Sequence, residues 1–275
     1  MMSLVIGFGN LAIGLAYIGL GTLGAWETIS LHRYRGWSRF GIGFSLMAAS
    51  CGPHHLVHGW HVLQGETVSW PMFAATLIGL PSGLIFVMLR LEAMWGGQGE
   101  RTIIASPDRV AMLAGAFTLV AGGLAAGAVA QPGAEALWQV VCTSAGLATR
   151  APAMASGIDF TSITFAANLF VTVTYGMVGW YLADSQVRRY LANGAWSLSG
   201  IALTGVFFTC AQMHLIDATT RGDNVMLIFD LIGIPVSVYF LWVVKLVYND
   251  SVTDWNRRPL VGAAAAPDRP SPWSG

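Results

Sequence analysis

The chain alternates between long apolar stretches and short polar connections. Apolar runs of about 20 residues, the length of a helix that crosses a bilayer, are expected seven times. They are Leu4 to Trp26, Phe40 to Leu63, Met72 to Met94, Val110 to Ala130, Thr161 to Leu182, Ser197 to Ala218 and Leu227 to Tyr248. The pattern predicts an all-α polytopic membrane protein with seven transmembrane helices.

The composition supports this interpretation. Of the 275 residues, 55% are hydrophobic and only 10% are charged, which excludes a soluble domain of ordinary composition. The apolar composition makes the lipid bilayer the expected partner. The 14 basic and 14 acidic residues cancel in charge, so binding to nucleic acid is not expected. The first span has no basic leader, and we expect it to remain in the protein as a helix.

Lysine and arginine are distributed unevenly among the connections. The opposite sides of the predicted bundle differ in this respect. One side carries Arg33, Arg35, Arg39, Arg101, Arg109, Arg188, Arg189, Lys245, Arg257, Arg258 and Arg269, and the other carries Arg150 and Arg221. Because basic loops stay in the cytoplasm, this distribution predicts an external N-terminus and a cytoplasmic C-terminus in a multi-pass protein of the cell (inner) membrane.

The second half of the chain repeats the first. Three pairs of segments match at offsets of 154 to 159 residues: Asn10 to Tyr17 with Asn168 to Tyr175, Cys51 to His55 with Cys210 to His214, and Leu77 to Pro81 with Leu231 to Pro235. The sequence therefore predicts two parallel three-helix repeats, joined by a connector helix and related by a pseudo-twofold axis along the membrane normal. The expected units are residues 1–95 and 161–250 for the repeats, 96–160 for the connector helix and an external loop, and 251–275 for a disordered cytoplasmic tail.

The most chemically distinctive stretch lies in the second span. Five side chains share one helical face with an arc of about 120°. They are Cys51, His54, His55, His58 and His61. Ionisable side chains inside a bilayer are costly, so we expect this face to point towards protein and to form a functional site.

Each repeat keeps a cysteine and a histidine one helical turn apart. Cys51 with His55, and Cys210 with His214, place two donors on one side of a helix. Sulfur and imidazole in an apolar setting favour soft or borderline metal ions, so Cu(I) is the expected cofactor and zinc comes next. A lone cysteine or histidine in such a helix usually belongs to the packed core, and the repetition of the pair is what favours metal ligation.

Other polar residues near these pairs have several roles open to them. His54, His58 and His61 are candidate ligands, while contact with lipid headgroups, a proton relay or support of the ligands would also explain them. Asn10 and Asn168 are candidates for hydrogen bonds to the site or between helices.

Two acidic residues lie near the predicted outer ends of the last spans. Asp217 stands where the first repeat has His58, so the two halves of the site are expected to be chemically unequal. Asp217 and Asp230 are both candidates for a role in the site.

These motifs resemble the membrane sensor domain of ethylene receptors. The resemblance covers residues 10 to about 90 and, more weakly, 168 to about 244. It rests on Asn10-x6-Tyr17, Trp37, Cys51-Gly-x-x-His55 and Trp60. In that family a three-helix domain acts as a dimer and binds Cu(I), which captures ethylene.

The resemblance implies roles for individual residues. Cys51 and His55 would bind copper, and so would their counterparts Cys210 and His214. Two tyrosines would line the site: Tyr17 and Tyr175. The chain departs from the family pattern because asparagine replaces the helix-one aspartate at both positions, 10 and 168.

Several functions remain open on the sequence. The first is a sensor that binds a small hydrophobic or gaseous ligand through Cu(I) and signals through a separate partner. The second is a copper-dependent membrane oxidoreductase that acts on a lipophilic substrate with a redox partner. The third is copper uptake or transfer, and haem ligation by histidines is a fourth.

Overall fold

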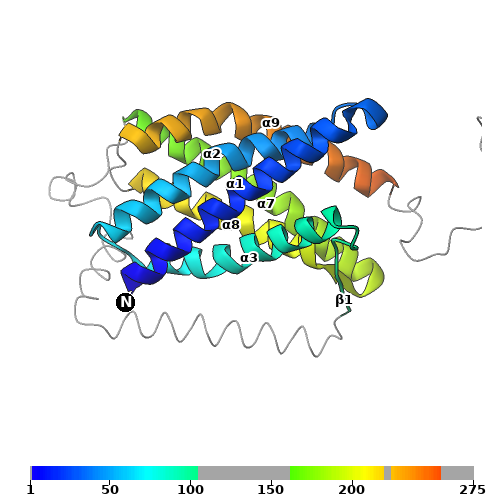
Figure 1. The fold of residues 1–275 in the computed structure, drawn as a ribbon, viewed down its shortest axis with the longest axis horizontal. Helices are drawn as coiled ribbons and strands as arrows, with labels where there is room; N and C mark the ends of the chain where they lie inside the picture. The colour runs from blue at the N-terminus through cyan, green and yellow to red at the C-terminus, as the bar shows by residue number, and fades with distance from the viewer. Residues whose placement is uncertain (1, 105–161, 220–223, 255–275) are drawn as a thin grey trace, which may run out of the picture.

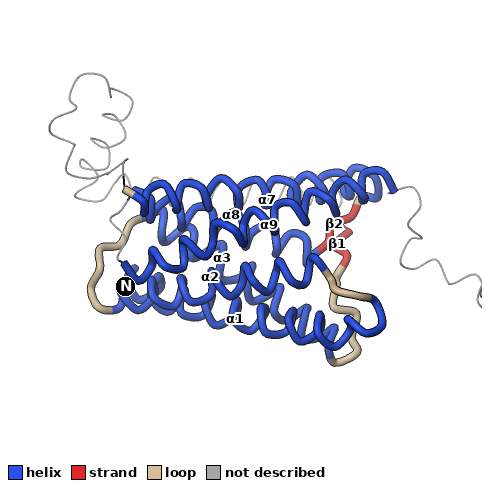
Figure 2. The backbone as a smooth tube through the Cα atoms, turned by 90° about the horizontal axis from the view of Figure 1, so that it is seen from above, coloured by secondary structure: helices blue, strands red, loops and turns tan. Residues whose placement is uncertain are grey.

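The computed structural model describes residues 2–104, 162–219 and 224–254, and most of these residues are helical. The long helices lie roughly side by side in one bundle (Figures 1 and 2). They are α1 (Met2–Arg35), α2 (Arg39–Leu63), α3 (Trp70–Met94), α7 (Ile163–Asn193), α8 (Leu198–Thr219) and α9 (Asn224–Asp254). A short antiparallel pair, β1 (Thr102–Ile104) and β2 (Ala195–Ser197), joins two connections at one end of the bundle.

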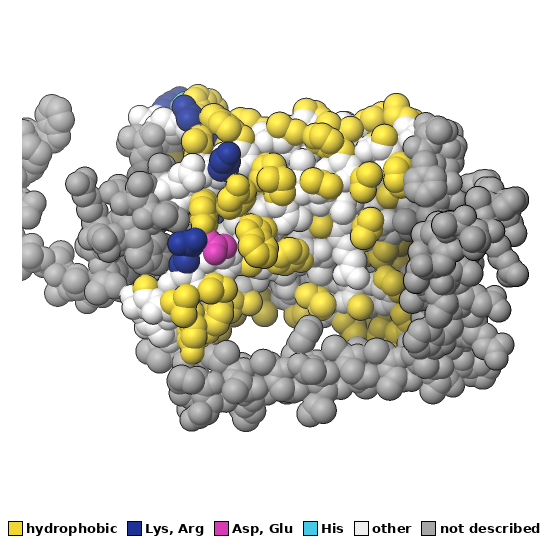
Figure 3. Space-filling view, turned by 180° about the vertical axis from the view of Figure 1, so that it is seen from behind, with side chains coloured by type: hydrophobic (Ala, Val, Ile, Leu, Met, Phe, Trp, Pro, Cys, Tyr) yellow, Lys and Arg dark blue, Asp and Glu magenta, His cyan; other side chains and the backbone are white. Residues whose placement is uncertain are grey.

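Five of the described helices are long and apolar enough to cross a membrane: α1, α3, α7, α8 and α9. α2 has the same length as α3, 25 residues, but its buried side chains include three histidines. Large apolar side chains such as Phe8, Leu15 and Met88 are exposed on the outside of the bundle. Figure 3 shows one face that is mainly apolar across its middle, with its few charged side chains towards one end. These are the features of a mostly helical membrane protein.

Six of the expected spans coincide with observed helices, and some helices are longer than expected. α1 ends at Arg35 and α7 at Asn193, about two to three turns beyond their predicted ends. α9 continues to Asp254, so the expected disordered tail from residue 251 is wrong for its first four residues, which extend the helix. The expected connector helix 110–130, the external loop 131–160 and the rest of the tail lie outside the described residues.

Glycines allow α1 and α2 to pack against each other with little space between their backbones. A Cβ atom on Gly14 would lie 2.8 Å from the carbonyl oxygen of Gly52, and one on Gly59 would lie 2.7 Å from the carbonyl oxygen of Gly7. Real side chains cannot approach a backbone oxygen so closely, so glycine is required at these crossings. This close approach brings the polar residues of α1 beside those of α2.

An aromatic core fills the middle of the bundle, where the first three helices meet the last three. Tyr17, Phe44, Tyr175, Phe207 and Phe240 are all buried in one cluster. Phe207 and Phe240 stack with ring centroids 5.2 Å apart, and Tyr175 contacts Phe207 edge-on at 5.6 Å. The same cluster contains both described cysteines, so the thiols lie in the packed interior of the bundle.

The strand pair brings a carboxylate to the start of α8. Glu100 accepts a hydrogen bond from Ser197 Oγ at 2.7 Å and another from the Ser199 hydroxyl. Burial raises the pKa of the Glu100 carboxyl, but the hydrogen bonds from Ser199 and Ser197 lower it by more, and the pKa is below its ordinary value. This contact links the connection after α3 to the connection before α8.

Candidate metal centre

The cysteine and histidine residues of α2 point into the bundle, as the helical spacing predicts. Cys51, His54, His55 and His58 are each at most 3% exposed. His61 lies in the last turn of α2 and is partly exposed. Four of the five polar residues on this face are therefore buried, and the fifth lies where the helix ends.

The two cysteines meet at the centre of the bundle in a crossed arrangement. Cys51 on α2 lies with its Sγ 3.1 Å from the hydroxyl of Tyr175 on α7. Cys210 on α8 lies with its Sγ 3.5 Å from the hydroxyl of Tyr17 on α1. Both thiols belong to the same buried cluster. Each sulfur thus lies beside a tyrosine hydroxyl from the other group of three helices.

His55 is held by an asparagine on one side and faces a sulfur on the other. Its Nδ1 lies 2.7 Å from Asn10 Oδ1, and its Nε2 lies 3.9 Å from Cys210 Sγ. The amide nitrogen of Asn10 donates to Thr76 Oγ1 at 3.1 Å and to the Ile6 carbonyl oxygen, so Oδ1 is the acceptor for the imidazole. Nδ1 then carries the proton, and the lone pair on Nε2 is available to a metal ion.

His214 repeats this arrangement in the other half. Its Nδ1 lies 2.7 Å from Asn168 Oδ1. Asn168 Nδ2 donates to Asp230 Oδ2 at 2.6 Å, which sets the orientation of the amide. The ring of His214 meets Tyr175 edge-on at 5.7 Å, as His55 meets Tyr17 at 5.3 Å. Both imidazoles are therefore oriented in the same way by equivalent neighbours.

A cluster of acids and histidines adjoins the thiols. His54 Nε2 lies 2.8 Å from Asp217 Oδ2, and His54 Nδ1 lies 3.3 Å from Asp230 Oδ1. Asp230 Oδ1 is also 3.4 Å from His214 Nδ1. Three buried atoms in the described residues have no hydrogen-bond partner: His54 Nδ1, His58 Nε2 and Asp230 Oδ1. Buried polar atoms without a partner are uncommon and call for a ligand or ion.

One group of three residues in the described structure offers ligand atoms that all lie within 4.8 Å of one another: His54, His214 and Asp230. This group could hold a metal ion, and its nitrogen and oxygen donors do not identify which metal. Among the four predicted copper ligands, Cys210 and His55 face each other across the two groups of helices, with Sγ 3.9 Å from Nε2. The centre therefore has a sulfur-containing part and a nitrogen and oxygen part, with His214 between them.

The asymmetry of this second cluster was only partly visible in the sequence. Asp217 was expected to differ from its counterpart His58, and it binds His54 from α8. Asp230 on α9 is completely buried, although nothing in the sequence ranks it above Asp217 as a site residue. The available signal was an aspartate inside an otherwise apolar run, which is costly unless it has a function.

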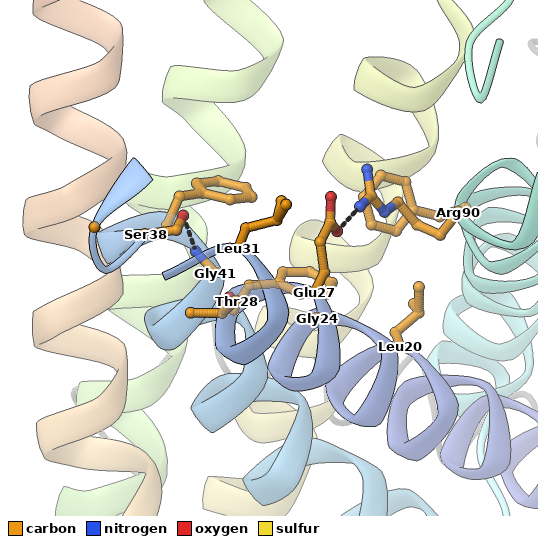
Figure 4. Close-up of a pocket in the computed structure, with 12 residues that line it drawn as sticks. Leu20, Gly24, Glu27, Thr28, Leu31, Ser38, Gly41 and Arg90 are labelled. Atoms are coloured by element: carbon orange, nitrogen blue, oxygen red, sulfur yellow. Dashed lines mark hydrogen bonds and ion pairs between the residues drawn. The ribbon is translucent and has the colours of Figure 1, made fainter. Parts of the chain in front are cut away.

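A pocket of about 450 Å³ lies where the end of α1, the start of α2 and the end of α3 meet (Figure 4). Glu27 and Arg90 form an ion pair at its wall, and Leu20 and Phe86 add apolar surface. None of the described residues that line it is a histidine or a cysteine. Its size alone does not make it the functional site, because the chemically reactive groups are elsewhere.

No protein-family model, no curated protein and no solved structure matches the chain. The function of the chain is therefore inferred from its residues and their geometry. The structure brings together Asn10, Tyr17, Cys51, His54, His55, Asn168, Tyr175, Cys210, His214 and Asp217. His58 is buried beside Asp217 and His54, and His61 lies beyond it at the end of α2.

Proposed function

We propose that the chain is an integral membrane copper(I)-binding protein similar to the sensor domain of ethylene receptors. Cys51, His55, Cys210 and His214 would hold the copper. The observation that carries this proposal is the crossed arrangement, in which each thiol lies against the tyrosine of the other group of helices and Cys210 also faces the imidazole of His55. Burying several thiol, hydroxyl and imidazole groups together is costly, and a core that served only for packing would use apolar side chains instead.

The donor set fits a soft ion. Thiol sulfur and neutral imidazole nitrogen are the ligands that Cu(I) prefers, and carboxylate oxygen suits harder ions. The separation of 3.9 Å between Cys210 Sγ and His55 Nε2 leaves space for an ion bonded to both at about 2.3 and 2.0 Å, with a wide bond angle. A thiolate and a monovalent cation also cancel in charge, which lowers the cost of placing them in an apolar interior.

The tyrosines and asparagines would prepare the ligands. Tyr175 can donate a hydroxyl hydrogen to Cys51 Sγ, which stabilises the thiolate that a metal requires. On the other side the Cys210 thiol donates its hydrogen to the Tyr17 hydroxyl, which holds this sulfur in place. Asn10 and Asn168 hold the protons of the imidazoles on Nδ1 and keep Nε2 free. Bound copper would supply affinity for a small unsaturated or gaseous ligand within an apolar site.

We also propose that the chain is a fused pair of three-helix repeats with seven transmembrane helices in all. The matching pairs of asparagine with histidine, and of tyrosine with cysteine, support two equivalent halves. A fourth span at 110–130 would return the chain to the outer side, so that both repeats run in the same direction. The N-terminus and the histidine-rich end of α2 would then face outwards in the cell membrane.

Copper binding by purified protein tests this function. The full chain in detergent, without a histidine tag, is loaded with Cu(I) under nitrogen, and its copper is measured against a competing chelator. We expect Cys51→Ala, His55→Ala and Cys210→Ala each to weaken copper binding by more than about tenfold. His32→Ala is the matched control, because His32 lies at the far end of α1, stacked on Trp37. Copper retained at full affinity by the triple variant would refute these ligands.

A second candidate function is a copper-dependent membrane oxidoreductase. Asp217 and Asp230 beside His54 favour it, because carboxylates and an imidazole in contact can accept and deliver protons. The same copper-loaded protein separates the two functions. Reversible binding of ethylene or carbon monoxide without oxygen consumption supports the sensor, and oxygen consumption with a lipophilic reductant supports the enzyme.

A further inference from the structure

We infer that His54, Asp230 and His214 form a second metal site, for a divalent cation of the zinc type, beside the proposed copper site. This inference goes beyond the proposed function and does not require it, because its ligands are nitrogen and oxygen atoms and include neither cysteine. The site joins α2, α8 and α9 and lies completely inside the bundle.

The spacing of the donor atoms fits one tetrahedral ion. An ion with ligands at about 2.0 to 2.1 Å keeps neighbouring ligand atoms about 3.3 to 3.4 Å apart. Asp230 Oδ1 lies 3.3 Å from His54 Nδ1 and 3.4 Å from His214 Nδ1. These distances are longer than good hydrogen bonds, and neither Asp230 Oδ1 nor His54 Nδ1 makes one.

The side chains behind the ligands are arranged as in known metal sites. His54 offers Nδ1 to the proposed ion, while its Nε2 lies 2.8 Å from Asp217 Oδ2. A carboxylate on the outer nitrogen of a ligand histidine fixes the ring and increases its basicity. Asp230 is held in a similar way, because its Oδ2 accepts a hydrogen bond from Asn168 Nδ2.

Charge also favours a divalent ion at this position. Asp217 and Asp230 bring two carboxylates into a buried cluster whose other members are histidines. With neutral imidazoles, two carboxylates and one divalent cation sum to zero, and a neutral cluster costs least in a low-dielectric interior. Zinc accepts this mixture of imidazole and carboxylate ligands, with a fourth position left for water.

The two sites share His214. Its Nδ1 serves the divalent ion, whereas the copper site needs Nε2 with the proton on Nδ1 bound to Asn168. Metal binding at Nδ1 displaces that hydrogen bond. Occupancy of one site is therefore expected to oppose occupancy of the other.

Cobalt(II) is the probe that tests this site. The full chain carrying Cys51→Ser and Cys210→Ser is titrated with Co(II), whose visible spectrum reports its ligands. We expect one equivalent to bind with d–d bands and without a sulfur charge-transfer band, and Zn(II) to displace it. Asp230→Asn and His54→Gln should each weaken Co(II) binding by at least about tenfold.

Asp184→Asn is the matched control, since Asp184 lies on α7 and is bonded to Arg188 rather than to the cluster. The circular dichroism and the elution volume of every variant show whether it is folded, and either ligand variant is sufficient for the test. The inference is overturned if the parent binds no Co(II), or if a folded ligand variant binds it as tightly as the parent. Failure of copper binding at the cysteines would leave this result unaffected.

Discussion

His54 and His55 are neighbours in the sequence, yet they take part in different chemistry. His54 contacts two aspartates from α8 and α9, and His55 contacts an asparagine from α1 and a sulfur from α8. Adjacent residues on a helix differ by about 100° in direction, which is enough to place them in separate surroundings. One imidazole is thus surrounded by hard oxygen donors and the other faces a soft sulfur donor.

The asparagine that orients His55 can be tested alone. Asn10→Ala removes the acceptor on Nδ1 and leaves the side chains that would bind the metal in place. We expect copper affinity to fall by about 10 to 100-fold, because the tautomer and the ring orientation are no longer set. Asn193→Ala, at the exposed end of α7, is the control. An unchanged affinity in Asn10→Ala would mean that His55 needs no support from α1.

At the scale of elements, the contact between α1 and α2 decides whether the polar residues meet. Gly14 and Gly52 lie opposite each other, and the carbonyl oxygen of one occupies the space where the other would carry a Cβ. Asn10 lies one turn before Gly14, and His55 lies just after Gly52. The distance of 2.7 Å between Asn10 Oδ1 and His55 Nδ1 therefore depends on two helices at close range.

Two alanine substitutions in the same helix isolate this effect. In Gly14→Ala the new Cβ would lie 2.8 Å from the backbone of α2, so the helices must separate, whereas Gly19 has no atom within 4 Å of such a Cβ. We expect Gly14→Ala to destabilise the protein by about 1 to 3 kcal/mol and to weaken copper binding. Gly19→Ala should be neutral or slightly stabilising. Thermal unfolding in detergent measures both, and equal melting temperatures for the two variants would contradict the close contact.

At the scale of the whole molecule, the two groups of three helices meet through α2 against α9 and α3 against α8. The candidate metal centre lies at this junction, because its ligands come from both groups. The strand pair and Glu100 make a further link at the other end. Metal bound at the junction is expected to hold the two groups together, which is how a ligand-dependent change at the centre could reach both ends.

The link through Glu100 predicts a dependence of stability on pH. The folded pKa of Glu100 is below its ordinary value, so the carboxylate stabilises the fold above the unfolded pKa of about 4.3, and this contribution is lost as the pH falls through the folded pKa. Glu100→Gln should lower the melting temperature at pH 7 by about 2 to 4 °C, corresponding to about 1 kcal/mol or less for a partly exposed group. The difference should shrink below about pH 4. A difference that grows on acidification would contradict this sign.

Features that depend on neighbouring residues in the chain can be predicted from the sequence, whereas contacts between distant residues cannot. Apolar length and helical periodicity are local, so the membrane-type helices and the inward direction of Cys51 and His55 could be predicted. Tyr175 entered the predicted site only through a resemblance, because nothing near it in the chain indicates that its hydroxyl lies 3.1 Å from Cys51. Asp230 gave a weaker signal, since a single acid in an apolar run has no expected partner.

The amino-acid sequence is enough to predict a bundle of apolar helices with a repeated cysteine and histidine pair on an inward face, because hydropathy and spacing act within a few turns of chain. The packing of the helices adds that each cysteine meets a tyrosine of the opposite group of helices, and that Cys210 also meets His55. It also decided that Asp217 and Asp230 meet at His54, more than 160 residues away in the sequence. Such contacts depend on how helices pack across the junction, and the packing is set by the glycines and aromatic side chains of all the helices together.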